Sequence, residues 1–237
     1  MMLTELQDLL KTCPPQAARS EYTEAILAAN CCGKLTSATR RATLQRLSEL
    51  YGLSGDVTLF QIFRRLWYSA GDEQPLLALL LALARDPLLR STAPSILDLP
   101  INEVLARKSV SNSLSQGLGS RLNEAVLDKV LRNAMSSWTQ SGHLLGRVFK
   151  ARQKAISGPY AATFALLLAF LAGYRGTALL TSPWARLLDR SAAEIENLAV
   201  EAKRRGLIDL HAGGGLFDIS FDRLLTETER KRVRESH

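Results

Sequence analysis

A helix that leads directly into a two-stranded hairpin is predicted twice in the second half of this 237-residue sequence. The first unit has an amphipathic helix at 123–141 and a strand–turn–strand pattern at 143–156. The second has a helix from Ser191 to Gly206, then two alternating strands on either side of the glycines at 213–215. Elsewhere the apolar residues recur at helical spacing. The sequence therefore predicts a mainly α fold, a helical bundle with winged-helix-like helix–hairpin elements and little β structure.

Two strongly apolar segments are predicted to be buried helices. The longer, Tyr160–Tyr174, is shorter than the roughly 20 residues that span a bilayer, and Leu76–Ala84 is shorter still. The first ten residues are acidic and amphipathic, unlike a signal peptide. We therefore expect a cytoplasmic protein with no membrane partner.

A polar stretch rich in Ser, Asn and Gly, Ser109–Ser120, follows a short helix predicted at Ile101–Arg107. Composition of this kind is typical of a connection between folded units. The sequence thus predicts an N-terminal helical domain at 1–118 and a C-terminal helical domain at 119–237, which holds both helix–hairpin units.

The first unit carries most of the chain's positive charge. From Arg121 to Lys154 there are seven bases and two acids, a balance of +5 out of the formal +7 of the whole chain. The bases on the hairpin have no acid among them, and the polar side of the preceding helix carries residue types that hydrogen-bond phosphates and base edges. The predicted nucleic-acid contacts are Lys129, Arg132 and Asn133 on the helix and Arg147, Lys150, Arg152 and Lys154 on the hairpin.

A second basic segment, in the helix predicted at 38–51, adds Arg40, Arg41 and Arg46 to these contacts. Arg41 is the strongest candidate there, because Arg40 falls near the apolar stripe and is placed to snorkel or to pair with an acid. The second hairpin differs in sign, since Asp209, Asp218 and Asp222 surround it. It is therefore expected to be structural or to face a protein partner.

No arrangement typical of catalysis is apparent in the sequence. His143, His211 and His237 are scattered, and the three cysteines include the vicinal pair Cys31-Cys32 without zinc-ligand spacing. The three glycines at 213–215 lack the following Lys-Ser/Thr and helix of a phosphate-binding loop. We expect a protein that is not an enzyme and uses no metal or cofactor.

Several segments resemble the BrxA family of bacterial BREX phage-defence systems. They are the run Ala-Ala-Asn-Cys-Cys-Gly-Lys-Leu-Thr-Ser at 28–37 and its continuation to 47, the apolar segment 75–86, and the helix 122–133 with Gly-His-Leu-Leu at 142–145. The resemblance covers most of residues 20–210 and rests on residue type. It implies a small, almost all-helical protein that binds double-stranded DNA without catalysis, beside the other BREX components.

The expected function is therefore a non-catalytic accessory protein that binds the phosphate backbone of double-stranded DNA with low sequence specificity. Two alternatives stay open. One is a scaffold that docks a larger defence-system protein through the acidic hairpin and the apolar helices. The other is an RNA-binding, antitermination-like helical protein, because basic helical folds also bind RNA. The oligomeric state is not predicted.

Overall fold

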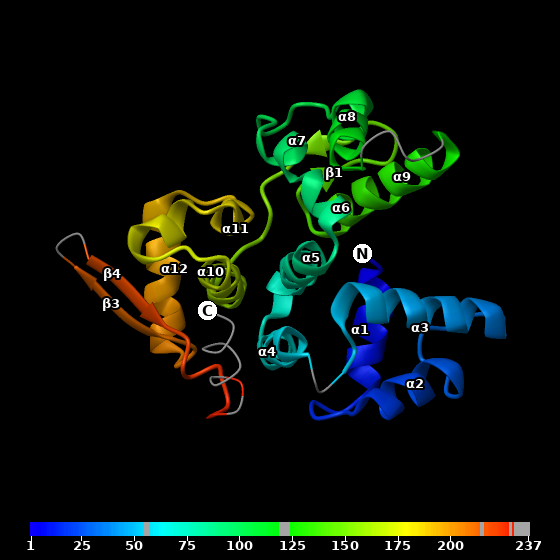
Figure 1. Cartoon of the computed structure of the whole chain (residues 1–237), viewed down its shortest axis with the longest axis horizontal. Helices are drawn as coiled ribbons and strands as arrows, with labels where there is room; N and C mark the ends of the chain where they lie inside the picture. Colours follow the sequence, from blue (N-terminus) through cyan, green and yellow to red (C-terminus); the bar gives the residue numbers. More distant parts are fainter. Residues whose placement is uncertain (55–56, 119–123, 214–215, 228, 230–237) are drawn as a thin grey trace.

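The computed structural model describes residues 1–54, 57–118, 124–213, 216–227 and 229. This portion of the chain is mainly helical, with two small antiparallel sheets of two strands each (Figure 1). The predicted fold class is confirmed. The helices are α1 (Leu3–Thr12), α2 (Arg19–Leu27), α3 (Ser37–Tyr51), α4 (Thr58–Trp67), α5 (Gln74–Arg85), α6 (Pro87–Ser91), α7 (Ala93–Leu97), α8 (Arg107–Leu118), α9 (Glu124–Gln140), α10 (Pro159–Leu171), α11 (Pro183–Arg186) and α12 (Ala192–Arg204), with 3-10 turns η1 (Gly71–Glu73) and η2 (Gly176–Thr181). The strands are β1 (Leu144–Leu145), β2 (Ala151–Arg152), β3 (Asp209–Gly213) and β4 (Leu216–Ser220).

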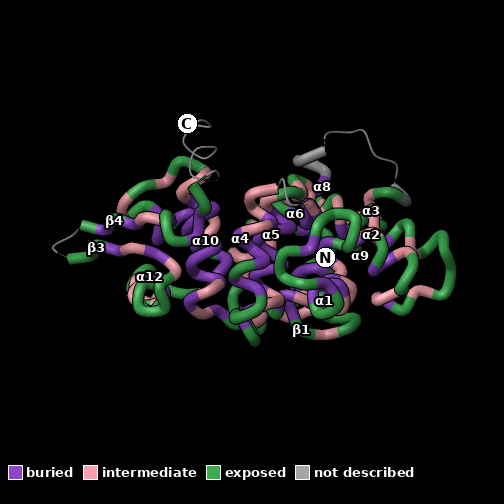
Figure 2. The backbone as a smooth tube through the Cα atoms, turned by 90° about the horizontal axis from the view of Figure 1, so that it is seen from below, coloured by how far each residue is buried: buried purple, intermediate pink, exposed green. Residues whose placement is uncertain are grey.

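The two most apolar helices, α5 and α10, form the centre of the molecule. Every residue from Leu76 to Leu83 is buried in α5, and every residue from Ala161 to Ala169 is buried in α10. The two helices pack against each other, and Figure 2 shows buried backbone concentrated around them. A helix that is apolar on all sides needs such a place, so both predictions of buried helices are confirmed. Among the described residues, no helix combines the length and the hydropathy needed to cross a membrane.

The start of α10 is fixed by a buried carboxylate from the turn before α5. Glu73 accepts a hydrogen bond from the backbone N–H of Ala161 at 2.8 Å, where the helix dipole favours a negative charge. Burial raises the pKa of Glu73, and backbone hydrogen bonds from Ala161 and Gly158 act in the opposite direction. A Cβ atom at Gly158 would lie 2.5 Å from the Glu73 carboxylate, so only glycine allows this close approach. Segments more than 80 residues apart are joined at this point.

The ends of several helices lie where the sequence predicts them. The Thr36 hydroxyl caps α3 by accepting from the Thr39 N–H, and Gly52 ends that helix with a φ of +66°. Ser191 caps α12 in the same way, through the Glu194 N–H at 3.3 Å. These capping contacts are local, because each joins residues no more than four positions apart in the sequence.

The segment before α8 differs from its prediction. Residues 101–106 are not helical; instead Val104 forms an isolated antiparallel bridge with Ala151 of the first hairpin. The N–H of Asn102 also donates to the Arg152 carbonyl at 2.9 Å, and the Arg152 N–H donates to Glu103. Pairing with a strand about 50 residues away therefore prevails over the local helical pattern.

The polar stretch 109–120 is largely helical, because α8 runs to Leu118. Buried residues before and after it, such as Leu105 and Leu131, belong to one hydrophobic cluster. Residues 119–123 lie outside the described residues of the chain, and the division into domains at 118 and 119 stays a prediction.

Candidate nucleic-acid interface

Helix α9 has the two faces that the sequence predicts. Leu131, Ala134 and Trp138 are buried against the core, and the Trp138 indole N–H donates to the Thr92 hydroxyl at 2.8 Å. The polar face, with Lys129, Arg132, Asn133 and Ser136, is exposed. The apolar stripe thus fixes which side of α9 is presented to solvent.

The hairpin after α9 is short and built around a closely packed loop. Leu144 pairs with Arg152 and Leu145 with Ala151, so each strand has only two residues. The connection, residues 146–150, is here called the hairpin loop. Gly146 has a φ of +114°, and a Cβ atom on it would collide with the Phe149 carbonyl oxygen. The predicted helix–hairpin unit is confirmed as α9, β1 and β2.

Lys150 anchors the hairpin loop. Its ammonium donates to the Thr139 hydroxyl of α9 at 2.8 Å and to the Gly146 carbonyl at 3.1 Å. The Lys150 carbonyl accepts from the Leu105 N–H at 2.8 Å, just before α8. Its half-buried side chain therefore holds the loop on α9, and its role as a phosphate contact stays a prediction.

Arg152 does not lie on the surface, and its predicted nucleic-acid contact is wrong. Its side chain is 2% exposed and forms a bidentate ion pair with Asp189, with Nη1 3.0 Å from Oδ2. The guanidinium also donates to the Ile96 carbonyl at 3.0 Å. A buried cation needs such partners, and both Asp189 and Ile96 come from other segments. The ion pair between Arg152 and Asp189 joins β2 to the loop before α12.

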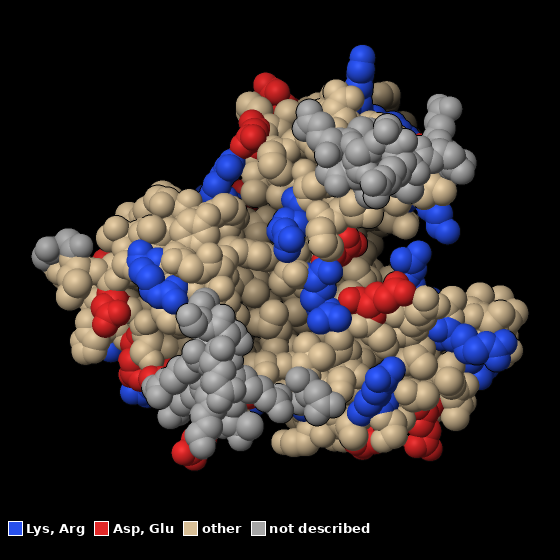
Figure 3. Space-filling model, viewed as in Figure 1, with Lys and Arg blue, Asp and Glu red and all other residues tan. Residues whose placement is uncertain are grey.

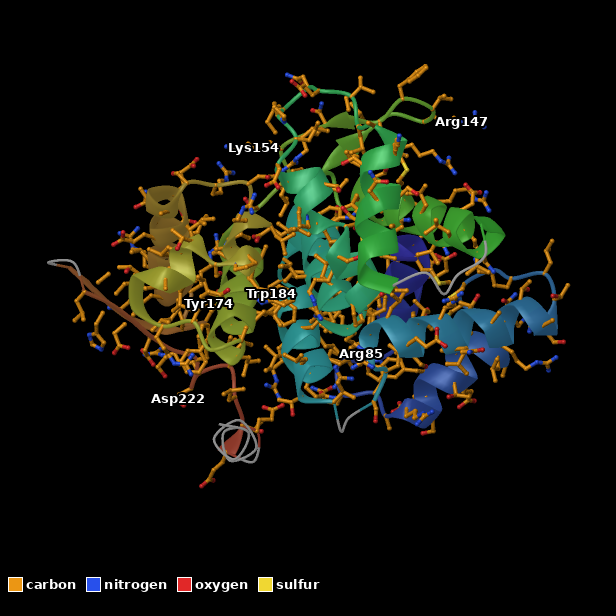
Figure 4. The ribbon with its side chains drawn as sticks, turned by 45° about the horizontal axis from the view of Figure 1, so that its top comes forward. Arg85, Arg147, Lys154, Tyr174, Trp184 and Asp222 are labelled. Carbon is orange, nitrogen blue, oxygen red and sulfur yellow. The ribbon has the colours of Figure 1, made fainter. Side chains whose placement is uncertain are left out.

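Lys154 lies away from the other predicted contacts. Its ammonium is 3.9 Å from the Glu194 carboxylate of α12, which Arg190 also contacts. Figure 4 shows Arg147 and Lys154 on opposite sides of the region of the molecule that contains the hairpin. Arg147 is exposed on the hairpin loop and forms no ion pair or hydrogen bond within the described residues.

Helix α8 adds two exposed bases that the sequence pattern does not single out, Arg107 and Lys108. The carboxylate of Asp128 pairs with Arg107 of α8 and with Arg132 of α9, which brings the exposed sides of the two helices together. The sequence signal that could have identified these bases is the adjacent Arg-Lys pair at the start of a helix. It is hard to recognise because the composition of the segment that follows is typical of a linker.

The exposed bases Arg107, Lys108, Lys129 and Arg132 are here called the α8–α9 basic surface. In sequence, α8, α9 and the hairpin loop hold six bases and two acids, a net charge of +4; the two bases outside this surface are Arg147 and Lys150. One of the acids, Asp128, is shared by Arg107 and Arg132. The excess charge predicted for this unit is therefore present, but on two helices and a loop instead of a helix and two strands.

Of the three predicted contacts in α3, Arg40 is used within the protein, whereas Arg41 and Arg46 are exposed. Arg40 is half-buried and donates to the carbonyls of Leu27 at 3.1 Å and Lys34 at 3.3 Å, so it secures the end of α2. Arg46 is exposed and 3.5 Å from Glu49, whereas Arg41 is exposed and has no partner among the described residues. Figure 3 shows a notch between the region with α8 and α9 and the region with α2 and α3, with Lys and Arg side chains on both sides.

The second helix–hairpin unit, α12 with β3 and β4, has the predicted layout and lies at the opposite end of the molecule from α9 (Figure 1). Its strands pair from Asp209 and Ser220 to Gly213 and Leu216. The Asp209 carboxylate forms an ion pair with Arg223 at 2.7 Å, and this pairing lowers the pKa of Asp209. The acidic character predicted for this hairpin is thus partly neutralised.

A serine, a histidine and an aspartate meet beneath the first hairpin. The Ser141 hydroxyl lies 2.8 Å from His143 Nδ1, and His143 Nε2 lies 3.0 Å from the Leu187 carbonyl and 3.7 Å from Asp189. The carbonyl can only accept, so the neutral ring carries its proton on Nε2. Burial lowers the pKa of His143 to about 4, and Ser141 and His143 are both buried. The cluster supports the hairpin from inside.

The cysteines are free thiols near the start of the chain. Burial raises the pKa of Cys13 to about 11 and that of Cys32 to about 12, so both stay protonated at neutral pH. In the described residues of the chain, no group of three or more His, Cys, Asp or Glu side chains is placed to hold a metal ion.

The α8–α9 basic surface and the neighbouring Arg147 are therefore the strongest candidate site, and the evidence for a function lies in their geometry. A comparison of the chain with protein-family models, curated proteins and solved structures gives no match.

Proposed function

We propose that this protein is a non-catalytic accessory protein that binds the backbone of double-stranded DNA with low sequence specificity. The observation that carries the proposal is the net charge of +4 on α8, α9 and the hairpin loop, with exposed bases on all three. Lys and Arg side chains gathered on one surface attract the phosphate backbone and release its counterions. The resemblance of the sequence to the BrxA family is the reason for placing this activity in a BREX-type phage-defence system.

The distribution of the charges supports backbone contact. Lys108, Lys129 and Arg147 have no acid partner within the described residues, so phosphates do not have to displace an internal ion pair. Arg107 and Arg132 both pair with the Asp128 carboxylate, so these three side chains together keep one positive charge. Long flexible cations on two helices and a loop suit an extended polyanion better than one small ligand.

The scaffold alternative is weaker on this geometry. The apolar helices that it would use, α5 and α10, are buried in the core. The hairpin that it would use carries an aspartate already paired with an arginine, Asp209 with Arg223.

The test is a fluorescence-anisotropy titration of a labelled duplex of mixed sequence across a series of salt concentrations. The triple variant Lys108→Glu, Lys129→Glu, Arg147→Glu is expected to bind roughly 30-fold more weakly at moderate salt. Its plot of log affinity against log salt should be shallower by about 2.7, since three phosphate contacts are lost. All three side chains are exposed, so the variant should unfold at the temperature of the unmodified protein.

A matched control carries the same change of charge elsewhere. Lys11, Arg19 and Arg204 are exposed and lie outside α8, α9 and the hairpin loop, and their replacement by Glu should change affinity by only a few-fold. Equal losses in the two triple variants would remove the assigned site. Duplex RNA of the same sequence is titrated in parallel, and binding to RNA alone would replace DNA by RNA in the proposal.

A further inference from the structure

The hairpin loop exposes apolar side chains in an unusual way. Val148 and Phe149 are each 78% exposed, and Leu145 on the neighbouring strand is 65% exposed. An aromatic ring of this size is normally buried because leaving it in water forgoes its hydrophobic stabilisation. Single exposed apolar residues are common, but three at the end of one short hairpin mark a contact surface.

The loop that carries these side chains is held in one shape. Gly146 allows a turn that would be closed to any residue with a Cβ atom, because the Phe149 carbonyl oxygen occupies that position. Lys150 fastens the loop to α9 through the Thr139 hydroxyl and to the segment just before α8 through the Leu105 N–H. Phe149 is therefore presented by a preorganised support, and its contact with a partner requires little ordering of the backbone.

The surroundings of Phe149 indicate the chemistry of that partner. Arg147 lies two residues away, exposed and without an acid partner among the described residues. The loop is hydrogen-bonded to Thr139 of α9 and to Leu105 just before α8, the two helices that carry the α8–α9 basic surface. An apolar side chain beside an arginine, at the end of a basic unit, is the combination with which proteins enter the minor groove and separate neighbouring base pairs.

We propose that Phe149, with Val148 beside it, is a wedge that enters the minor groove of duplex DNA held on the α8–α9 basic surface. The ring would partly unstack one base step and bend the duplex, while Arg147 lies along the adjacent phosphates or in the groove. This inference rests on the proposed function and adds a mode of binding to it. Deformable pyrimidine–purine steps would be the favoured sites, because they unstack most easily.

The experiment compares the whole protein with its Phe149→Ser variant on a short duplex that contains several TA steps and a dye at each end. Unmodified protein should shorten the end-to-end distance measured by energy transfer, and should raise the fluorescence of a 2-aminopurine placed beside a TA step. Phe149→Ser is expected to abolish both signals and to weaken binding roughly tenfold. The salt dependence of its affinity should stay unchanged, since no charge is removed.

The matched control is Leu216→Ser, which removes an apolar side chain that is 64% exposed on the other hairpin. It should leave affinity, bending and unstacking unchanged. Both replaced side chains are exposed, so thermal unfolding of the two variants should match that of the unmodified protein.

The outcomes separate the two proposals. Salt-dependent binding of duplex DNA by the unmodified protein, with the same bending and unstacking in Phe149→Ser, overturns the wedge and leaves the proposed function in place. No binding of the duplex by the unmodified protein overturns the proposed function and the wedge with it. A loss of affinity in Phe149→Ser with no bending by the unmodified protein also overturns the wedge, and indicates a flat contact in its place.

Discussion

The Asp189→Ala variant is expected to lose about 3–5 kcal/mol of unfolding free energy. Asp189 is the carboxylate partner of Arg152, whose side chain is 2% exposed, and it also accepts the Ala155 N–H at 2.9 Å. Removing it leaves a buried guanidinium without its counter-charge, which costs more than the pair contributes. Alanine adds backbone strain, because residue 189 has a φ of +53°.

Urea denaturation followed by circular dichroism would measure this loss. Asp189→Asn separates charge from strain, since asparagine tolerates the left-handed backbone, and it should still lose about 2 kcal/mol. The control is Asp98→Ala, which breaks the ion pair of Asp98 with Arg186 on the surface, where both side chains are at least half exposed. That variant should lose less than about 1 kcal/mol. Similar losses for Asp189 and Asp98 would mean that the buried pair is not a determinant of stability.

Acidification is expected to destabilise the protein through His143. Burial lowers the pKa of His143 to about 4, from 6.5 in the unfolded chain. Between these values the unfolded chain binds a proton that the folded protein excludes. The contribution of the neutral ring is therefore complete above pH 6.5 and decreases as the pH falls to 4, by about 3 kcal/mol in total.

The measurement is the free energy of unfolding at pH 7.5, 5.5 and 4, by denaturant titration. His143→Gln should be less stable at pH 7.5, because two buried hydrogen bonds, to Ser141 and to the Leu187 carbonyl, are disturbed. Its loss on acidification should be smaller than that of the unmodified protein by about 3 kcal/mol. The control is His211→Gln, because His211 lies exposed on β3. An equal pH dependence in His143→Gln and the unmodified protein would contradict the assignment.

The features that are predicted correctly depend on short-range signals. Both hairpins follow from a helix stop at Gly142 or Gly206, the second also from strand alternation, and the buried central helices follow from composition alone. The two faces of α9 follow from helical periodicity, which also places Lys129 in solvent.

The features that the sequence does not reveal depend on contacts between distant segments. The balance of charges along the sequence treats Arg152 as unpaired, although Asp189 lies 37 residues later and meets it only in the folded chain. In the same way, the role of Arg107 is hidden because its link to α9 passes through Asp128, 21 residues away. A charge count along the sequence finds the basic unit, and only the fold decides which of its bases face the solvent.

The packing of α5 against α10 bears on how the molecule loses its structure. Glu73, before α5, holds the first turn of α10, so the halves of the chain on either side of residue 118 share both an apolar contact and a buried carboxylate. Separating the two helices would expose apolar side chains of both, and each also packs against further helices, α5 against α3 and α10 against α12. Melting should therefore be cooperative across this contact, with a single heat-absorption peak in calorimetry.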